Sequence, residues 1–299
     1  MLAIDWGTSS LRIYLLDADG KIIDARQSDN GILAVKDSAF AQVLEDAAAD
    51  WIDSSGTQIM MSGMIGSRQG WKEANYVPCP AGLPEIASAM CAVQWRSGNG
   101  QTRNARIAPG LSCRDESGTA DVMRGEEVQI LGVLRQIGGG EQLVCLPGTH
   151  SKWVRVRDNR ITSFRTHMSG EVFAVLKQHS ILGRTMSTDQ FDDAAFVDGV
   201  SRAADAGGML HHLFGVRAQV IAGNLPDAQS ASYLSGIIIG HELLSEAPQA
   251  ARFHLVGASK LNRVYSLAAS TMNLTAIVHD DDAAPRGLFL LAQYLEHAL

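Results

Sequence analysis

Two short stretches of this chain share one arrangement of glycine and hydroxyl residues. Residues 3–14 read AIDWGTSSLRIY and residues 144–154 read VCLPGTHSKWV. Each stretch predicts an apolar strand, a Gly-Thr-x-Ser turn and a second strand, followed by a polar turn and a third strand. The two glycines, Gly7 and Gly148, lie about half the chain length apart. We therefore interpret the chain as two related lobes.

A turn of this composition can bind an anion. Glycine lets the backbone approach a ligand closely, and the amides and hydroxyls of a tight turn form a concave anion site. One such turn alone is typical of an ordinary β-hairpin, but its repetition favours two turns that hold the phosphates of one nucleotide across a cleft. The residues expected to line the phosphates are Gly7, Thr8 and Ser9 in the first turn and Gly148, Thr149 and Ser151 in the second.

Asp5 precedes the first glycine on the same predicted strand. A carboxylate there can hold Mg²⁺, directly or through water. The alternative is an Asx-turn that pins the hairpin. Because Asp5 accompanies the repeated turn, we predict that it is a metal ligand. Arg12, on the next strand, either reaches the phosphates or is a solvated strand residue.

Bulk properties exclude several classes of partner. The net charge of −7 argues against nucleic acid and anionic membranes, because both require clustered positive charge. The four cysteines show no metal-ligand spacing, which indicates reduced thiols. No apolar run approaches the roughly 18 residues of a membrane span, and the N-terminus lacks a signal-peptide pattern. We expect a cytoplasmic protein, and Ala-rich helices make a homodimer plausible.

The pattern of apolar residues predicts an α/β protein in which strands and helices alternate. Strands are expected within 2–27, at 58–61, 106–108, 143–147, 152–157, 160–166, 253–256 and 275–278. Helices are expected at 40–52, 121–136, 169–178, 231–244, 261–270 and 286–299, with mixed helix and loop at 185–205 and a proline-rich loop at 76–84. Three glycines at 138–140 mark the expected boundary between lobes 1–140 and 141–299. The last helix is expected to pack back toward the first lobe.

Four stretches resemble the 2-dehydro-3-deoxygalactonokinase family of the actin/hexokinase/Hsp70 ATPase superfamily. They are IDWGTS at 4–9, SGMIGS at 62–67, DVMRGEE at 121–127 and LPGTHSKW at 146–153. The resemblance implies two ribonuclease-H-like lobes with the active site in the cleft between them. It implies ATP and Mg²⁺ as cofactors and transfer of the γ-phosphoryl group to the 6-hydroxyl of 2-dehydro-3-deoxy-D-galactonate. Pro147 departs from the superfamily, where many members carry an Asp, and the role of His150 stays open.

The resemblance also suggests a catalytic base. Sugar kinases of this superfamily place an Asp at the start of a long helix, and Asp121 resembles it. The helix dipole would keep such a carboxylate ionised and ready to accept a proton. The alternative is that Asp121 only caps the helix, in which case Glu126 is the next candidate. Arg124 is expected to bind the sugar acid's carboxylate or to pair with Glu127.

The remaining expected contacts come from small residues and one aromatic residue. Ser62, Gly63 and Met64 follow a strand, where α/β folds commonly place ligands, and are expected to form the floor under the sugar. Trp71 is a candidate wall or a core residue. The segment Gly257, Ala258 and Ser259 is expected beside the nucleoside, although a tight strand–helix turn has the same sequence.

Three other functions remain open from the sequence. The acceptor could be another small molecule, such as 2-keto-3-deoxygluconate or a hexose derivative. The protein could be a regulatory ATPase without a small acceptor, or a sugar-binding scaffold without catalysis. The presence of Asp5, Asp121 and both turns argues against the scaffold.

Overall fold

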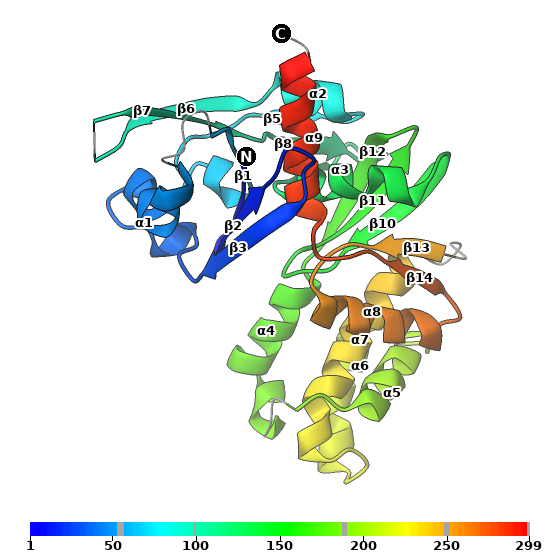
Figure 1. Ribbon diagram of the computed structural model, residues 1–299. Coiled ribbons are helices and arrows are strands. Elements are labelled where there is room, and N and C mark those ends of the chain that lie inside the picture. Colours follow the sequence, from blue (N-terminus) through cyan, green and yellow to red (C-terminus); the bar gives the residue numbers. More distant parts are fainter. Residues whose placement is uncertain (53–56, 99, 187–189, 248–251, 298–299) are drawn as a thin grey trace. The chain divides into compact units, whose positions relative to one another are not determined.

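The computed structural model describes residues 1–52, 57–98, 100–186, 190–247 and 252–297 (Figure 1). Contacts divide the chain into two compact units. Unit 1 comprises Met1–Gln142, Val154–Phe164 and Asp281–Leu299, and unit 2 comprises Leu143–Trp153 and Arg165–Asp280. Strands and helices alternate through both units, which confirms the α/β class.

Unit 1 contains a six-stranded sheet in the order β3-β2-β1-β4-β7-β6. Its strands are β1 (Leu2–Trp6), β2 (Leu11–Leu16), β3 (Ile22–Ser28), β4 (Ile59–Ser62), β6 (Cys91–Arg96) and β7 (Thr102–Ile107). The antiparallel β1-β2-β3 meander predicted from the sequence is confirmed. Because β4 runs parallel to β1, Asp5 and Ser62 are neighbours at the carboxyl ends of the two strands.

Aromatic and aliphatic side chains fill the core on the α1 side of this sheet. Helix α1 (Phe40–Ile52) has the bounds predicted from the sequence. The ring of its first residue, Phe40, lies 5.7 Å from that of Trp6 and 6.4 Å from that of Trp71. The β6–β7 hairpin, which the sequence pattern reveals only in part, adds Trp95, whose ring lies 5.0 Å from that of Trp71.

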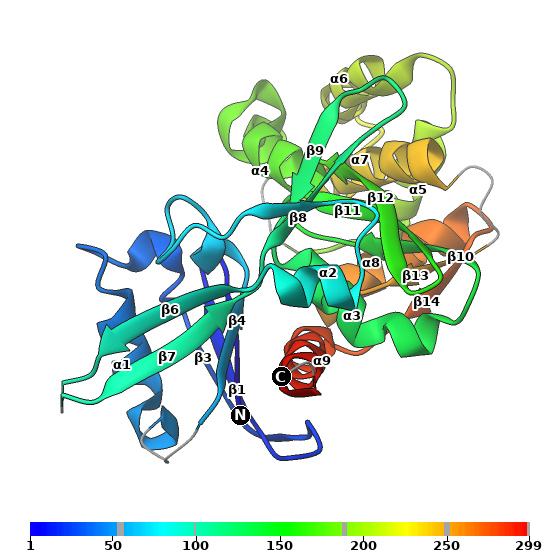
Figure 2. The ribbon, with the colours of Figure 1, turned by 90° about the horizontal axis from the view of Figure 1, so that it is seen from above.

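Helix α9 (Ala283–His297) packs against α3 (Glu126–Ile137) and β1, as Figures 1 and 2 both show. Glycines allow this close approach. A Cβ at Gly132 of α3 would overlap the carbonyl oxygen of Ala283, and a Cβ at Gly287 would overlap that of Val128.

Gly132→Ala should therefore destabilise unit 1. We expect a loss on the order of 1–3 kcal/mol in the free energy of unfolding, the usual range for overpacking, measured by denaturant titration. Gly139→Ala is the matched control, because a Cβ there meets nothing within 4 Å. Equal stability of the two variants would show that α3 and α9 do not pack as described.

A small second sheet in unit 1 corrects one expectation. Strands β5 (Tyr76–Pro78), β8 (Gly110–Arg114) and β9 (Ala120–Met123) form it. The helix expected from residue 121 is wrong, because residues 120–123 pair with β8 and place Met123 opposite buried Leu111. Helix α3 begins only at Glu126, after Gly125 turns the chain with φ +106°.

The proline-rich segment at 76–84 is also more regular than predicted. Its first residues form β5, which pairs with β8. Its end enters α2 (Leu83–Ser88), where Pro84 occupies the first turn, a position that needs no amide hydrogen.

The third sheet has the order β12-β11-β10-β13-β14. Its strands are β10 (Glu141–Leu146), β11 (Ser151–Arg157), β12 (Arg160–His167), β13 (Arg252–Leu255) and β14 (Thr275–Val278), all predicted from the sequence. The helices of unit 2 are α4 (Ser169–His179), α5 (Asp193–Ala203), α6 (Gly208–Ile221), α7 (Ser230–Glu246) and α8 (Ser259–Thr271). Helix α6 was not predicted, because its apolar residues do not gather on one buried face.

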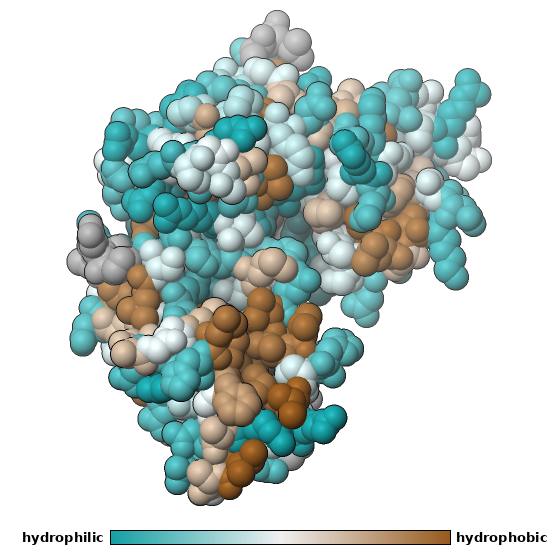
Figure 3. Space-filling view, turned by 180° about the vertical axis from the view of Figure 1, so that it is seen from behind, coloured by the Kyte–Doolittle hydropathy of each residue, from teal (hydrophilic) through white to brown (hydrophobic). Residues whose placement is uncertain are grey.

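Three large side chains of α6 are exposed instead. They are Leu210, Phe214 and Ile221, with exposed fractions of 85%, 62% and 69%. Figure 3 shows apolar side chains gathered on one face of unit 2. Among the described residues, no helix is long and apolar enough to cross a membrane.

Candidate active site

The first Gly-Thr-x-Ser turn joins β1 to β2 and is supported from one side. The amide of Leu33 donates to the carbonyl oxygen of Thr8 at 3.3 Å. Gly31 lies so close that a Cβ would overlap the backbone of Thr8 and Ser9. Thr8 and Ser9 themselves are exposed and Gly7 is half-buried. The backbone of the turn is thus held in place, while Thr8 and Ser9 are exposed to solvent.

The second turn joins β10 to β11 and is supported in the same way. The amide of Glu171 donates to the carbonyl oxygen of Thr149 at 3.0 Å. A Cβ at Gly170 would lie 2.6 Å from the carbonyl oxygen of Gly148. The repeat therefore extends to the supporting contacts. In both turns, a backbone amide from farther along the chain donates to the threonine carbonyl oxygen, and a nearby glycine packs against the turn.

The side chain of Ser151 does not face solvent. Ser151 is fully buried, and its hydroxyl lies 2.8 Å from the hydroxyl of Tyr265. The exposed polar side chains of this turn are those of Thr149 and His150. His150 pairs through Nε2 with the carboxylate of Glu171. A phosphate at this turn would meet Thr149, His150 and backbone groups, rather than the Ser151 hydroxyl.

Asp5 and Glu126 form an acidic pair in unit 1. The Asp5 carboxylate is 19% exposed and lies 3.6 Å from Nη1 of Arg12. Burial raises the pKa of Asp5, the Arg12 charge lowers this pKa, and the charge of Glu126 raises it again. The charge of Glu126 thus acts on Asp5, and contacts through Gly63 place the start of α3 near the end of β1.

Two glycines make this arrangement possible. A Cβ at Gly63 would lie 2.7 Å from the carbonyl oxygen of Trp6 and 3.3 Å from Oδ1 of Asp5. A Cβ at Gly125 would lie 3.1 Å from the Cα of Gly63. Both glycines have positive φ, +93° and +106°, a region that side chains rarely adopt. The loop after β4 and the start of α3 therefore pack directly at the end of β1.

Glu126 and Glu127 hold the turn that precedes α3. Oε2 of Glu126 accepts the amide hydrogen of Arg124 at 3.0 Å, and Oε2 of Glu127 accepts that of Gly125 at 2.7 Å. Burial, with a contribution from the charge of Glu126, raises the pKa of Glu127 to about 8. Glu127 is therefore mostly protonated at neutral pH and fully buried, whereas Glu126 is partly exposed.

The buried Glu127 should make stability depend on pH. Because its folded pKa of about 8 exceeds the ordinary 4.5, its stabilising contribution is fully present below pH 4.5 and is lost as the pH rises through 8. Glu127→Gln retains the acceptor for Gly125 but cannot ionise. We expect the variant to gain stability over the wild type between pH 5 and pH 8, on the order of a few kcal/mol.

Thermal unfolding of both proteins across this pH range tests the expectation. Glu116→Gln, at an exposed position, is the control and should follow the wild type at every pH. A constant difference between Glu127→Gln and the wild type would contradict the raised pKa.

Arg124 is buried beside the acidic pair. Its Nη2 donates to the carbonyl oxygen of Ala74 at 2.7 Å, and its guanidinium lies 4.4 Å from the ring centre of Tyr76. Nε and Nη1 have no hydrogen-bond partner among the described residues and are shielded from solvent. Buried donors without acceptors are unfavourable, so these two guanidinium nitrogens carry an unmet hydrogen-bonding capacity.

Asp121 lies on a strand and not at the start of a helix. It lies on β9 opposite Cys113, and its Oδ1 accepts the amide hydrogen of Val122 at 2.7 Å. Its charge contributes to raising the pKa of Cys113, after burial as the larger cause. No helix begins at Asp121, so the position expected for it at the start of a helix is wrong.

The residues expected around the sugar have different environments. Gly63 contacts the Asp5 region, as described above, and Met64 begins a short 3₁₀ turn there. Ser62 is fully buried, with its hydroxyl 3.5 Å from the carbonyl oxygen of Ile4. Trp71 packs into the aromatic core and is only partly exposed.

The Gly257-Ala258-Ser259 segment lies next to the second turn. Strands β10 and β13 are parallel, with Cys145 opposite Leu255, so their carboxyl ends meet. Gly257 has φ +152°, and a Cβ there would lie 3.6 Å from the carbonyl oxygen of Pro147. Ala258 and Ser259 then lead into α8.

A pocket of about 480 Å³ opens beside this segment within unit 2. Small residues, two lysines and a larger number of apolar and aromatic side chains line it, among them Gly148, Ser169, Lys177, Phe191, Lys260 and Tyr265. Its size and its mixture of apolar walls with a few polar groups are typical of small-ligand sites. Gly148 of the second turn is part of the pocket lining, so the pocket lies directly beside that turn.

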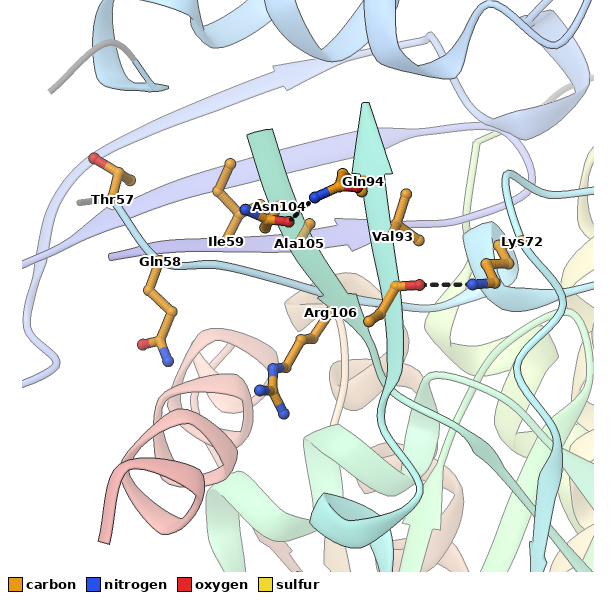
Figure 4. A pocket seen from close by; sticks show the side chains of 10 residues that line it. Thr57, Gln58, Ile59, Lys72, Val93, Gln94, Asn104, Ala105 and Arg106 are labelled. Atoms are coloured by element: carbon orange, nitrogen blue, oxygen red, sulfur yellow. Dashed lines mark hydrogen bonds between the residues drawn. The ribbon is translucent and has the colours of Figure 1, made fainter. Parts of the chain in front are cut away.

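A wider hollow of about 660 Å³ lies elsewhere in unit 1, over β4, β6 and β7 (Figure 4). Polar groups there already pair within the protein: Gln94 donates to Asn104 at 3.1 Å, and Lys72 donates to the carbonyl oxygen of Ala92 at 2.8 Å. Neither the glycine turns nor the acidic pair lines this hollow. Within unit 1 we therefore place the candidate site at the acidic pair and the first turn, although this hollow has the larger volume.

A family model and two known proteins similar in sequence to this chain have descriptions that name the same kinase. The model of the family described as 2-keto-3-deoxy-galactonokinase matches residues 5–291. A Rhizobium meliloti (strain 1021) protein described as a probable 2-dehydro-3-deoxygalactonokinase is 38% identical, over 95% of this chain and 93% of its own. The Escherichia coli (strain K12) 2-dehydro-3-deoxygalactonokinase is 35% identical, over 93% of each chain.

Solved structures agree. A Sinorhizobium meliloti crystal structure, provisionally assigned as a 2-dehydro-3-deoxygalactonokinase, has a TM-score of 0.89 at 37% identity and covers 98% of both chains. The Clostridium difficile activator of 2-hydroxyisocaproyl-CoA dehydratase, with a TM-score of 0.53, 11% identity and coverage of 100% and 96%, shares the fold alone. The predicted actin/hexokinase-like ATPase fold is confirmed, and the chain belongs to the 2-keto-3-deoxy-galactonokinase family.

Proposed function

We propose that this protein is an ATP-dependent kinase that phosphorylates the 6-hydroxyl of 2-dehydro-3-deoxy-D-galactonate in galactonate breakdown. The observation that carries the proposal is the acidic pair of Asp5 and Glu126 next to a phosphate-type turn, in a chain of this family. The product is the 6-phosphate with ADP. The oxygen of the hydroxyl bonds to the γ-phosphorus, the bond to ADP breaks, and the proton passes to a carboxylate.

We assign that carboxylate to Glu126 in place of Asp121. Glu126 is partly exposed and close enough to Asp5 to affect its pKa, whereas Asp121 is held on β9. Arg124, whose Nε and Nη1 have no hydrogen-bond partner among the described residues, is our proposed partner for the substrate carboxylate. Gly63 and Met64, together with the buried Ser62 beneath them and the edge of Trp71, remain the proposed surroundings of the sugar.

Asp5 and its surroundings fit a magnesium ion. The negative charge of Glu126 acts on the Asp5 carboxylate, which has Arg12 at 3.6 Å, and a divalent cation at Asp5 would offset this repulsion. Mg²⁺ commonly binds one or two carboxylates and completes its shell with water and phosphate oxygens, so a single Asp ligand suffices. When bound, the ion would neutralise charge on the transferred phosphoryl group. Asp5 would hold the ion, and Gly7, Thr8 and Ser9 would line the adjacent phosphates.

We infer that unit 2 binds the nucleotide. Gly148 and Thr149 would line its phosphates, with Ser151 supporting the turn from within. Gly257, Ala258 and Ser259 would lie beside the nucleoside at the 480 Å³ pocket. We further infer a cytoplasmic enzyme of two lobes, 1–140 and 141–299, without nucleic-acid or membrane partners. The exposed apolar side chains of α6 support a homodimer.

The test is a coupled ATP–ADP assay with purified protein and Mg²⁺. The acceptors are 2-dehydro-3-deoxy-D-galactonate, its gluconate epimer, pantothenate and common hexoses. We expect turnover on the galactonate compound well above that on all others. Preference for another acceptor would overturn the substrate assignment, and ATP hydrolysis without any acceptor dependence would overturn the kinase assignment.

A further inference from the structure

A buried carboxylate on α7 connects three elements around the second turn. Glu242 is 3% exposed. Its Oε1 accepts the indole hydrogen of Trp153 on β11 at 2.7 Å. Its Oε2 accepts the hydroxyl hydrogen of Tyr265 on α8 at 2.9 Å and that of Ser169 at the start of α4. The three donors therefore converge on one side chain.

These bonds determine the direction of a hydrogen-bond chain that ends at the turn. A tyrosine hydroxyl has one hydrogen, and Tyr265 donates it to Glu242. The 2.8 Å contact between Ser151 and Tyr265 must then use the hydrogen of Ser151. The lone pairs of Ser151 remain available for the amide of Gly148, 3.5 Å away. The order of donation is Gly148, Ser151, Tyr265, Glu242.

We propose that Glu242 is the positioning residue of the nucleotide site, because its carboxylate orients the Ser151 hydroxyl and thereby holds the Gly148–Ser151 turn in shape for phosphate. The inference rests on the proposed nucleotide role of unit 2. Glu242 acts through its neighbours: Ser169, Tyr265 and Gly148 line the 480 Å³ pocket, and Glu242 does not.

A carboxylate is required at position 242 because both of its oxygens accept hydrogen bonds from the surrounding donors. A glutamine in the same place has one acceptor oxygen and one donor group. If the amide nitrogen faced Tyr265, that hydroxyl would accept from it and donate to Ser151. The Ser151 hydrogen would then turn toward the amide of Gly148, which is itself a donor. If the amide nitrogen faced Trp153, it would meet the indole N–H of Trp153, and both groups are hydrogen-bond donors.

The experiment compares Glu242→Gln with a matched control, Glu246→Gln. Glu246 is also buried on α7, but its partners are His167 at 3.0 Å and Arg165 at 3.5 Å. Calorimetric titration with Mg·ADP, without any acceptor, measures nucleotide affinity directly. We expect Glu242→Gln to bind Mg·ADP about tenfold more weakly, the effect of one disrupted hydrogen bond. Glu246→Gln should bind it like the wild type.

Steady-state kinetics distinguish a positioning role of Glu242 from general damage to the protein structure. For Glu242→Gln we expect the KM for ATP to rise about tenfold, with the KM for the sugar acid unchanged. Tyr265→Phe interrupts the same hydrogen-bond chain without changing Glu242. We therefore expect the same rise in the KM for ATP and the same unchanged KM for the sugar acid. This variant replaces Glu242→Gln in the test if Glu242→Gln fails to fold. Unchanged Mg·ADP affinity in both folded variants, or an equal loss in Glu246→Gln, would overturn the proposal. Because binding is measured without acceptor, a wrong substrate assignment would leave this result intact.

Discussion

Glu126→Gln should reduce phosphoryl transfer by at least about 10²-fold, the usual contribution of a general base. Glutamine keeps the shape of the side chain, and its oxygen can still accept the amide hydrogen of Arg124. It cannot take the proton of the attacking hydroxyl. The variant should therefore fold normally and bind Mg·ADP like the wild type, while kcat at saturating ATP and sugar acid falls.

Asp121→Asn is the matched control. Asp121 lies on β9, where its carboxylate accepts a neighbouring amide hydrogen, and asparagine can do the same. We expect its kcat to stay within about twofold of the wild type, as for surface substitutions away from a site. The opposite result, a large loss in Asp121→Asn with near-normal turnover in Glu126→Gln, would return the role of base to Asp121.

Asp5→Asn should abolish most activity and yet stabilise the protein. Burial and the charge of Glu126 raise the pKa of Asp5, against the effect of Arg12. Stability from such a group is present below its ordinary pKa and lost as the pH rises through the raised one, so ionisation of Asp5 costs stability. Asparagine removes this cost. It also removes the proposed magnesium ligand, whose loss corresponds to about 10²-fold or more in rate.

Two measurements check this prediction together. Thermal unfolding without nucleotide at pH 7 should give a higher Tm for Asp5→Asn than for the wild type. Addition of ADP should raise the Tm of the wild type more with Mg²⁺ than without it, and the variant should lose this difference. Asp19→Asn, on an exposed turn, should change neither quantity. A lower Tm together with an intact Mg²⁺ effect would show that Asp5 is a structural partner of Arg12.

The sequence alone determined most of the regular elements. The apolar alternation in residues 2–27 and the helical pattern of 40–52 agree with β1 to β3 and α1. These patterns are readable because one face of each element is buried and the other is solvated. The repeated Gly-Thr-x-Ser turn was also visible, because its residue types are needed for the turn itself. The family resemblance rested on the same motifs.

The tertiary structure decided which polar groups meet. Residues 120–123 become a strand because β8 offers buried partners there, and helix α3 starts where Gly125 permits a positive φ. This shift puts Glu126, and not Asp121, at the start of α3, which is why we propose Glu126 as the base. Likewise, nothing local to Ser151 shows that its hydroxyl is buried against Tyr265, 114 residues later. These features depend on contacts between segments that are far apart in the sequence. Local secondary-structure propensity therefore does not predict them.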